Sequence, residues 1–159
     1  MEELIQQYTK SNDHYKVVLV KAIGDRLAEA YTEFIHEKIR KEWWGYDKNE
    51  DLSVDDLIKV KYKGIRPACG YPMQPDHTEN MLLFDLLGVK EKSGIFLTES
   101  LAMYPANSVS ALLIANDKSF YFNTNELCKD QIEDYAKRKN MPVPEIEKWL
   151  KTTLSYEID

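Results

Sequence analysis

Arg66 is the residue whose surroundings best suit ligand binding. It lies in the stretch Tyr62–Pro72, whose two glycines and two prolines fit neither a helix nor a strand pattern. A proline pushes the residue before it out of the helical region, so Arg66 and Tyr71, which each precede a proline, are predicted to be extended. The planar guanidinium suits a carboxylate or phosphate, and glycines let a ligand approach the main chain. The alternative is a structural arginine that braces an ordinary turn.

A row of carboxylates spaced by four residues is the second candidate for chemistry. Like charges at this spacing repel by roughly a few tenths of a kcal/mol per pair, so something must compensate. Asp25 and Glu29 could face a cationic ligand or a partner domain. The alternative is a solvated row whose repulsion is relieved by nearby lysines and arginines, among them Arg40. This acidic row consists of Asp25, Glu29, Glu33 and Glu37.

No metal site is expected. Cys69 and Cys128 are too far apart in sequence to form a paired ligand motif, and both are predicted to be reduced thiols. His77 is the one histidine of three near the Arg66 stretch, whereas a metal site needs three or four convergent ligands. Asp76 beside it is better explained as a helix cap.

The acidic row requires a long helix to carry it. The sequence predicts one from about His14 to Trp44, with Gly45 after its C-cap, preceded by a shorter helix over residues 1–10. Apolar residues recur along the long helix at steps of three and four, which predicts one buried face. These residues are Val20, Ile23, Leu27, Tyr31 and Phe34.

Two capped helices are predicted to hold the Arg66 stretch between them. Ser53 is the expected N-cap of the first helix, with Asp56 at its third position. Asp76 is the expected cap of the second helix, with Glu79 at its third position and Gly88 at its end. Such a mount is stiff, as a binding loop requires.

Residues 94–124 change character and predict β-structure. Strands are expected over 95–98, 109–115 and 120–122, and the turn residues 116–119 should join the last two into a hairpin. Alternation places Tyr121 on the opposite face from its two aromatic neighbours. Helices are expected again over 124–139 and 145–150. Because the strands cluster between helical runs, the predicted fold class is α+β, with an antiparallel sheet packed with helices.

Bulk properties fit one domain over residues 1–159. A net charge of −6 argues against nucleic acid as a partner, because binding it needs clustered Lys and Arg. No apolar run is long enough for a membrane span and residues 1–10 do not resemble a signal peptide, so a cytoplasmic protein is expected. The chain also lacks the motifs of Rossmann, P-loop and hydrolase sites.

Several segments match one known family in order and nearly without gaps. They are Val20-Lys-Ala-x-x-Asp-Arg-Leu-Ala-Glu-Ala30, Trp44-Gly-Tyr46, Tyr62-x-Gly-Ile-Arg-Pro-Ala-x-Gly-Tyr-Pro72, Pro75-Asp-His-Thr-Glu79, Leu97-Thr-Glu-Ser100, Ser108-Val-Ser110 and Asp130-Gln-x-Glu-Asp-Tyr-Ala-x-Arg-Lys139. With these segments the chain resembles the C-terminal activation domain of cobalamin-dependent methionine synthase. The resemblance covers almost all of this chain, but not the whole of the longer family domain.

The resemblance implies a methyl-transfer role in methionine biosynthesis. The family domain binds S-adenosylmethionine outside any Rossmann fold and presents its methyl group to cobalamin that has become oxidised and inactive. Flavodoxin or an equivalent reductase supplies one electron. Because this chain has no Asp-x-His-x-x-Gly segment, the cobalamin-binding domain of the synthase would bring the cobalamin. The reactivity lies in the cofactors, so no catalytic acid or base is expected.

The resemblance also assigns contacts to the loop. Arg66 would fork onto the methionine carboxylate of S-adenosylmethionine. The main chain from Ala68 through Gly70 to Tyr71 would meet the amino group.

Four further residues take roles from the resemblance. Tyr121 and Phe122 would contact the adenosine. Glu29 would add negative potential near the sulfonium, and Asp25 would face a partner domain.

The family's N-terminal half, with an aspartate that binds the substrate's amino group, is not found in residues 1–159. Weak or no binding of S-adenosylmethionine and no turnover are therefore expected of these residues alone. The alternative function is a non-catalytic interaction module. It would dock on a cobalamin domain or flavodoxin through the acidic row, without binding S-adenosylmethionine.

Overall fold

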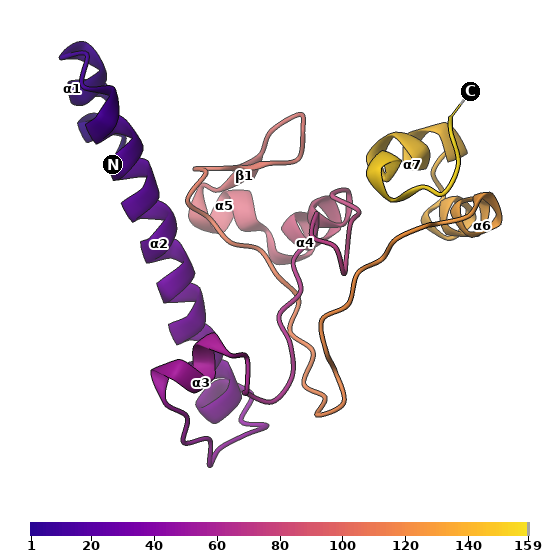
Figure 1. Ribbon diagram of the computed structural model, residues 1–159, viewed down its shortest axis with the longest axis horizontal. Coiled ribbons are helices and arrows are strands. Elements are labelled where there is room, and N and C mark those ends of the chain that lie inside the picture. Colours follow the sequence, from indigo (N-terminus) through magenta and orange to yellow (C-terminus); the bar gives the residue numbers. More distant parts are fainter. Residues whose placement is uncertain (159) are drawn as a thin grey trace. The chain divides into compact units, whose positions relative to one another are not determined.

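The structure is a computed structural model that describes residues 1–158. The chain divides into two units, Met1–Lys63 with Gly88–Val109, and Gly64–Leu87 with the residues from Ser110 onward. It therefore passes from one unit to the other after residues 63, 87 and 109 (Figure 1).

A helical hairpin begins the first unit. α1 spans Glu2–Lys10 and α2 spans His14–Lys38. The side chain of Asp13 caps α2 by accepting a backbone hydrogen bond of 3.1 Å, which ends the first helix and starts the second. The chain turns back here, so Met1 lies against Gly24, and Figure 1 shows α1 beside the first turns of α2. The predicted break between the two helices is confirmed.

The long helix ends in a π-helical turn, η1, over Ile39–Trp43. The N–H of Gly45 bonds to the carbonyl of Ile39 at 3.0 Å, and Gly45 has a φ of 70°. A left-handed glycine directly after a helix is a common way to end it. The predicted helix therefore has the expected extent, with its last turn wider than an α-helical one.

Arg40 lies inside the first unit instead of relieving the acidic row. Its side chain is 0% exposed and forms a two-point ion pair with Glu50, in which the Nη2–Oε1 distance is 2.7 Å. The guanidinium also lies 4.3 Å from the centroid of the Tyr62 ring. This burial was not predicted, because a helical arginine between acids is usually a surface residue.

The predicted buried face of the long helix is exposed at four of its five residues, and the fifth, Val20, is partly buried. The inward side of α2 carries small residues such as Gly24, which packs against Met1 and Asn107. The apolar side faces away, and Leu27 and Tyr31 are 65% and 64% exposed. The periodicity correctly located the apolar side of the helix, but none of residues 1–158 covers that side. This apolar face of α2 consists of Tyr15, Leu19, Ile23, Leu27, Tyr31 and Phe34.

Short elements complete the first unit. α3 (Val54–Ile58) begins at the predicted capping box of Ser53 and Asp56. α5 follows the left-handed Gly88, at which the preceding helix ends as predicted. An antiparallel pair, β1 and β2, closes the unit, and the expected strand over 95–98 is reduced to its two middle residues. The bounds are Val89–Ser93 for α5, Phe96–Leu97 for β1 and Met103–Tyr104 for β2.

The second unit has its core between its last two helices. Ile132 and Ala136 of α6 pack against Ile146 and Leu150. α6 begins later than the predicted residue 124, because Glu126 has a φ of 57°, which no α-helix contains, and the Cys128 N–H bonds to a glutamine side chain at the helix start. α7 begins two residues before the predicted position. The elements are α4 (Glu79–Leu87), α6 (Lys129–Lys139), α7 (Val143–Trp149) and η2 (Lys151–Thr153).

The predicted hairpin over 109–122 does not form. The turn at Asn116 is present, but the segment before it pairs with the Arg66 stretch through mutual bonds of Ile65 and Ile114 at 3.1 and 3.0 Å. The next bond runs from the Leu112 N–H to the Pro67 carbonyl at 2.9 Å. Proline has no N–H to return that bond, so the ladder stops. The α+β class with an antiparallel sheet is confirmed, and the sheet is the small β1–β2 pair.

Among residues 1–158, no helix combines the length and the apolar character that crossing a membrane requires.

Candidate functional site

The Arg66 loop is held in shape by two glycines with positive φ. Gly64 has a φ of 84°, and a Cβ there would collide with the carbonyl oxygen of Ile114. Gly70 has a φ of 88°, and a Cβ there would collide with the ring of His77. Side-chain-bearing residues rarely adopt such angles, so both glycines are required by backbone conformation and by space.

The far end of the loop is a tight turn. The Gly70 N–H bonds to the Gln74 carbonyl and the Gln74 N–H to the Tyr71 carbonyl, both at 2.8 Å. The Tyr71 N–H bonds to the Ala68 carbonyl at 3.3 Å. The Tyr71 side chain is exposed. The main chain from Ala68 to Gln74 is therefore fixed while an aromatic ring faces solvent.

Tyr121 meets Arg66 although the expected hairpin is absent. The Arg66 N–H donates to the Tyr121 hydroxyl at 2.9 Å, across 55 residues of sequence. Farther along, the Thr124 N–H bonds to the Pro72 carbonyl at 2.7 Å. Phe122 is about half exposed, beside the Phe120 ring at a centroid distance of 6.1 Å. The loop and the segment 110–124 thus form one continuous surface with exposed aromatic rings.

Asp25 and Glu29 lie one turn apart on α2, in the first unit. Both are exposed, and Asp25 accepts a hydrogen bond from the Asn107 side chain. The other half of the acidic row differs, since Glu37 pairs with Lys41 at 3.3 Å. This ion pair fits the solvated-row interpretation at that end, and Asp25 and Glu29 remain the candidates for function.

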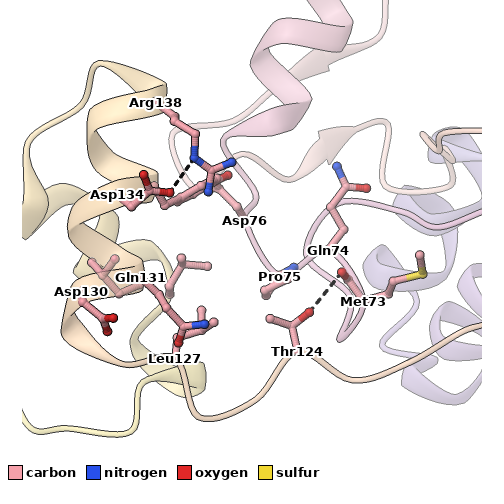
Figure 2. Close-up of a pocket in the computed structure, with 13 residues that line it drawn as sticks. Met73, Gln74, Pro75, Asp76, Thr124, Leu127, Asp130, Gln131, Asp134 and Arg138 are labelled. Carbon is pink, nitrogen blue, oxygen red and sulfur yellow. Dashed lines mark hydrogen bonds and ion pairs between the residues drawn. The ribbon is translucent and has the colours of Figure 1, made fainter.

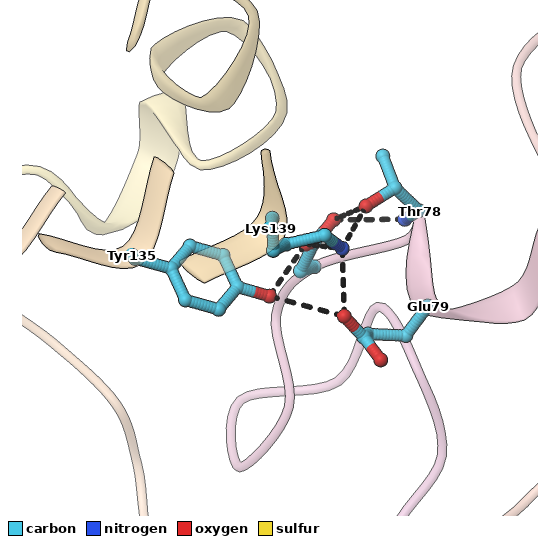
Figure 3. A network of polar contacts seen from close by, with 5 residues as sticks. Thr78, Glu79, Tyr135 and Lys139 are labelled. Carbon is cyan, nitrogen blue, oxygen red and sulfur yellow. Dashed lines mark hydrogen bonds and ion pairs between the residues drawn. The ribbon is translucent and has the colours of Figure 1, made fainter. Parts of the chain in front are cut away.

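A buried polar network fixes the chain directly after the loop (Figure 3). The predicted cap Asp76 accepts from the Thr78 N–H at 2.8 Å through one oxygen. Its other oxygen accepts from the Tyr135 hydroxyl and from Lys139 Nζ, both at 2.7 Å. Lys139 also pairs with Glu79 at 2.6 Å. The helix α4 begins at Glu79, which the prediction had placed at the third helical position, so Asp76 caps the turn at Thr78 before α4 and not α4 itself. Asp76 also joins the loop to α6, a role that sequence reasoning missed.

The surroundings of this network shift several pKa values. Burial alone would raise the pKa of Asp76, but hydrogen bonds from Lys139, Tyr135 and Thr78 outweigh it and the pKa is lowered. Burial would lower the pKa of Lys139, and its carboxylate partners raise it overall. The network therefore favours the ionised forms of both partners.

Cys69 and Cys128 are both free, as predicted. Cys69 is buried, and burial, with a smaller effect from Glu79 and Asp76, raises the pKa of its thiol to about 11. It is protonated at neutral pH, which argues against a nucleophilic role.

A cavity of about 530 Å³ lies between the end of the loop and α6 (Figure 2). Its polar wall includes Asp134, which pairs with Arg138 at 2.8 Å. The described residues that line it include none of the predicted ligand residues. In the described part of the chain, no three His, Cys, Asp or Glu side chains gather as a metal site would require. Its other lining residues include Met73, Pro75, Leu127, Asp130, Ile132 and Leu150.

Comparison with known proteins assigns the family. A profile described as the vitamin B12 dependent methionine synthase activation domain matches residues 1–140. The chain belongs to this family. Its sequence is also 46% identical to that of the chain in the crystal structure of the MetH reactivation domain bound to AdoHcy, and the two structures superpose with a TM-score of 0.95. That match covers 98% of this chain and 48% of the other, so the chain spans about half the length of that relative.

Within this activation-domain sequence, the predicted site residues fall into two groups. Arg66, Ala68, Gly70 and Tyr71 share one ordered loop, and Tyr121 bonds to it directly. Phe122 follows in the same exposed segment. Asp25 and Glu29 belong to the first unit. The ligand roles of all these residues stay predictions.

Gly70→Ala is expected to destabilise the activation-domain chain more than the equally left-handed Gly94→Ala. Gly94 has a φ of 75° and no atom within 4 Å of its Cβ position, so alanine there adds only backbone strain, about 1 kcal/mol. At Gly70 the collision with His77 should add about 1–3 kcal/mol. Urea unfolding of the two variants measures the difference, and equal losses would show that the His77 ring moves freely aside.

Acid is expected to weaken the Asp76 network. Because the pKa of Asp76 is lower in the folded chain than in the unfolded one, its stabilisation is complete well above the unfolded value of about 3.9. It is lost as the pH falls from about 4 through the folded pKa. Melting temperatures between pH 6 and pH 3 should fall more steeply for the wild type than for Asp76→Asn. Parallel curves would mean that other carboxylates cause the loss.

Proposed function

We propose that residues 1–159 act as one module that binds S-adenosylmethionine and serves the reductive reactivation of a cobalamin-dependent methionine synthase, a methyltransferase. Family membership supports the class of protein, and the AdoHcy bound by the relative supports the ligand. The observation that carries the proposal is the bond between Arg66 and Tyr121, because it joins a carboxylate-binding candidate to an adenosine-binding candidate.

The chemistry of the loop fits such a ligand. The Arg66 guanidinium can form two parallel hydrogen bonds with the methionine carboxylate. The ordered main chain between Ala68 and Tyr71 can receive the amino group, and the exposed rings of Tyr121 and Phe122 offer flat apolar surface to adenosine. These roles are binding and orientation, which suits a reaction whose donor is already activated as a sulfonium.

Glu29 and Asp25 extend the proposal to charge and to partners. A carboxylate near a sulfonium stabilises its positive charge, and Glu29 is exposed and available for this role. Asp25 is proposed to face the cobalamin domain. Cobalamin held by that domain, after one-electron reduction by flavodoxin or an equivalent reductase, would accept the methyl group. These 159 residues alone are not expected to turn over.

The proposal is tested by isothermal titration of S-adenosylmethionine and S-adenosylhomocysteine into the chain, up to millimolar ligand. Arg66→Ala should weaken binding by about 10- to 150-fold, because hydrogen bonds to a charged group contribute roughly 1.5–3 kcal/mol. Arg138→Ala is the matched control, since it removes an exposed guanidinium from the same unit. Unchanged affinity in folded Arg66→Ala would exclude the loop as the site.

A second candidate function is docking without ligand binding. The exposure of Asp25 and Glu29 favours it, because exposed carboxylates can steer a cationic partner surface. If the folded wild-type chain released no heat at millimolar S-adenosylmethionine, ligand binding would be excluded and docking would remain as the function. Charge reversal at Glu29 and Glu33 should then weaken binding to a cobalamin domain or flavodoxin, with a loss that shrinks at high salt.

A further inference from the structure

The proposed binding of S-adenosylmethionine does not explain why the apolar face of α2 is exposed. Tyr15, Ile23 and Phe34 on this face are 76%, 50% and 51% exposed. Tyr31 and Phe34 stack on each other with centroids 6.3 Å apart. The six residues extend over about 28 Å of helix, and monomeric proteins rarely expose apolar patches beyond roughly a few hundred Å². A long face of this kind indicates a protein partner.

The apolar face and the acidic row lie on different sides of the same helix. Leu27 is two residues from Asp25 and two from Glu29, so its side chain lies about 160° around the helix axis from each of these carboxylates. The inward side is already occupied, since Gly24 packs against Met1. The partner of the apolar face therefore need not touch Asp25 or Glu29.

The chemistry of the face defines the partner. Its six side chains are aliphatic or aromatic and none carries a charge. Tyrosine and phenylalanine anchors are typical of the desolvated centre of a stable interface. Such a face fits a preformed apolar surface and does not suit a nucleic acid.

The MetH reactivation domain indicates which segment would cover the apolar face. This protein matches 48% of that domain's chain at a TM-score of 0.95. The corresponding helix of the relative therefore has nearly the same conformation, and about as much chain again belongs to the same domain. We propose that the apolar face of α2 is the surface on which the rest of the activation domain packs. This inference does not rest on the binding of S-adenosylmethionine.

Co-production tests this proposal. The 159-residue chain carries an affinity tag and is produced together with the part of the MetH reactivation domain that lies outside the matched region. The two chains should co-purify in equal amounts. Leu27→Glu with Tyr31→Glu should reduce the co-purified partner at least about tenfold, because both side chains lie at the centre of the face.

Ile58→Glu is the matched control. Ile58 is 74% exposed in the same unit but belongs to α3 and not to the apolar face of α2, so co-purification should not change. Circular dichroism checks that the double variant is folded, which is expected because both positions are solvent-exposed. Wild-type recovery of the partner with the folded double variant would overturn the proposal. So would a stable homodimer of the 159-residue chain that the double variant dissociates, because the occupant would then be a second copy.

Discussion

Replacing Arg40 with methionine is expected to lower the free energy of unfolding by about 3–5 kcal/mol. The side chains of Arg40 and Glu50 are 0% and 3% exposed and form a two-point ion pair. Methionine would fill much of the same space but leave the Glu50 carboxylate buried without its cation. The contact between the guanidinium and the Tyr62 ring would also be lost.

Urea unfolding followed by circular dichroism measures this loss. The double variant Arg40→Met with Glu50→Leu should recover most of the stability, because replacing both charges by apolar groups is often neutral. Arg138→Met is the control, since Arg138 and Asp134 are 67% and 64% exposed and should contribute at most about 1 kcal/mol. A small loss in Arg40→Met would mean that water or a local rearrangement solvates Glu50.

Lys139→Met is the second large expected effect, at about 2–4 kcal/mol. Lys139 Nζ is the cation shared by Asp76 and Glu79, at 2.7 and 2.6 Å, and the Asp76 side chain is only 4% exposed. Without it two neighbouring carboxylates remain, and Asp76 keeps only the neutral hydroxyl donors Tyr135 and Thr78 besides the Thr78 N–H. The pKa of Asp76 should rise, because its largest hydrogen-bond contribution is removed.

Thermal unfolding of Lys139→Met should be compared with Lys137→Met, which changes an exposed lysine on the same helix. Lys137→Met should alter stability by less than about 0.5 kcal/mol. If the two variants melted together, the network would contribute little to stability. Ligand titration of Lys139→Met then reports whether the network also fixes the loop, because only a positioning role predicts weaker binding from a folded variant.

The local features of the fold were predictable because they depend on neighbours in sequence. The capping box of Ser53 and Asp56, the end of α4 at Gly88 and the long helix before Gly45 all follow from short-range rules. The hairpin prediction was wrong because alternation indicates a strand without naming its partner. Here the partner is the loop at Ile65, and the missing N–H of Pro67 limits the pairing.

Long-range polar contacts were the part that sequence could not supply. Arg40 was expected beside the solvated acidic row because charged residues usually lie on the surface, and no pattern pointed to its pairing with Glu50 or to the π-helical turn that carries it. Tyr135 and Lys139 did carry a signal, since their spacing of four puts both on one side of α6. This spacing predicts that the two residues share a side of the helix, but only the structure shows that both contact Asp76.

The hydrogen bond between Arg66 and Tyr121 sets the direction in which the tyrosine can act. Its hydroxyl oxygen already accepts from the Arg66 main chain, and a phenol has a single proton to give. That proton points away from the N–H it faces, so Tyr121 offers a donor to whatever lies beyond the loop. If adenosine binds at Tyr121 as proposed, a ribose oxygen or a purine ring nitrogen could accept this proton. The hydrogen bond to the loop would then make Tyr121 favour ligands that present an acceptor at this position.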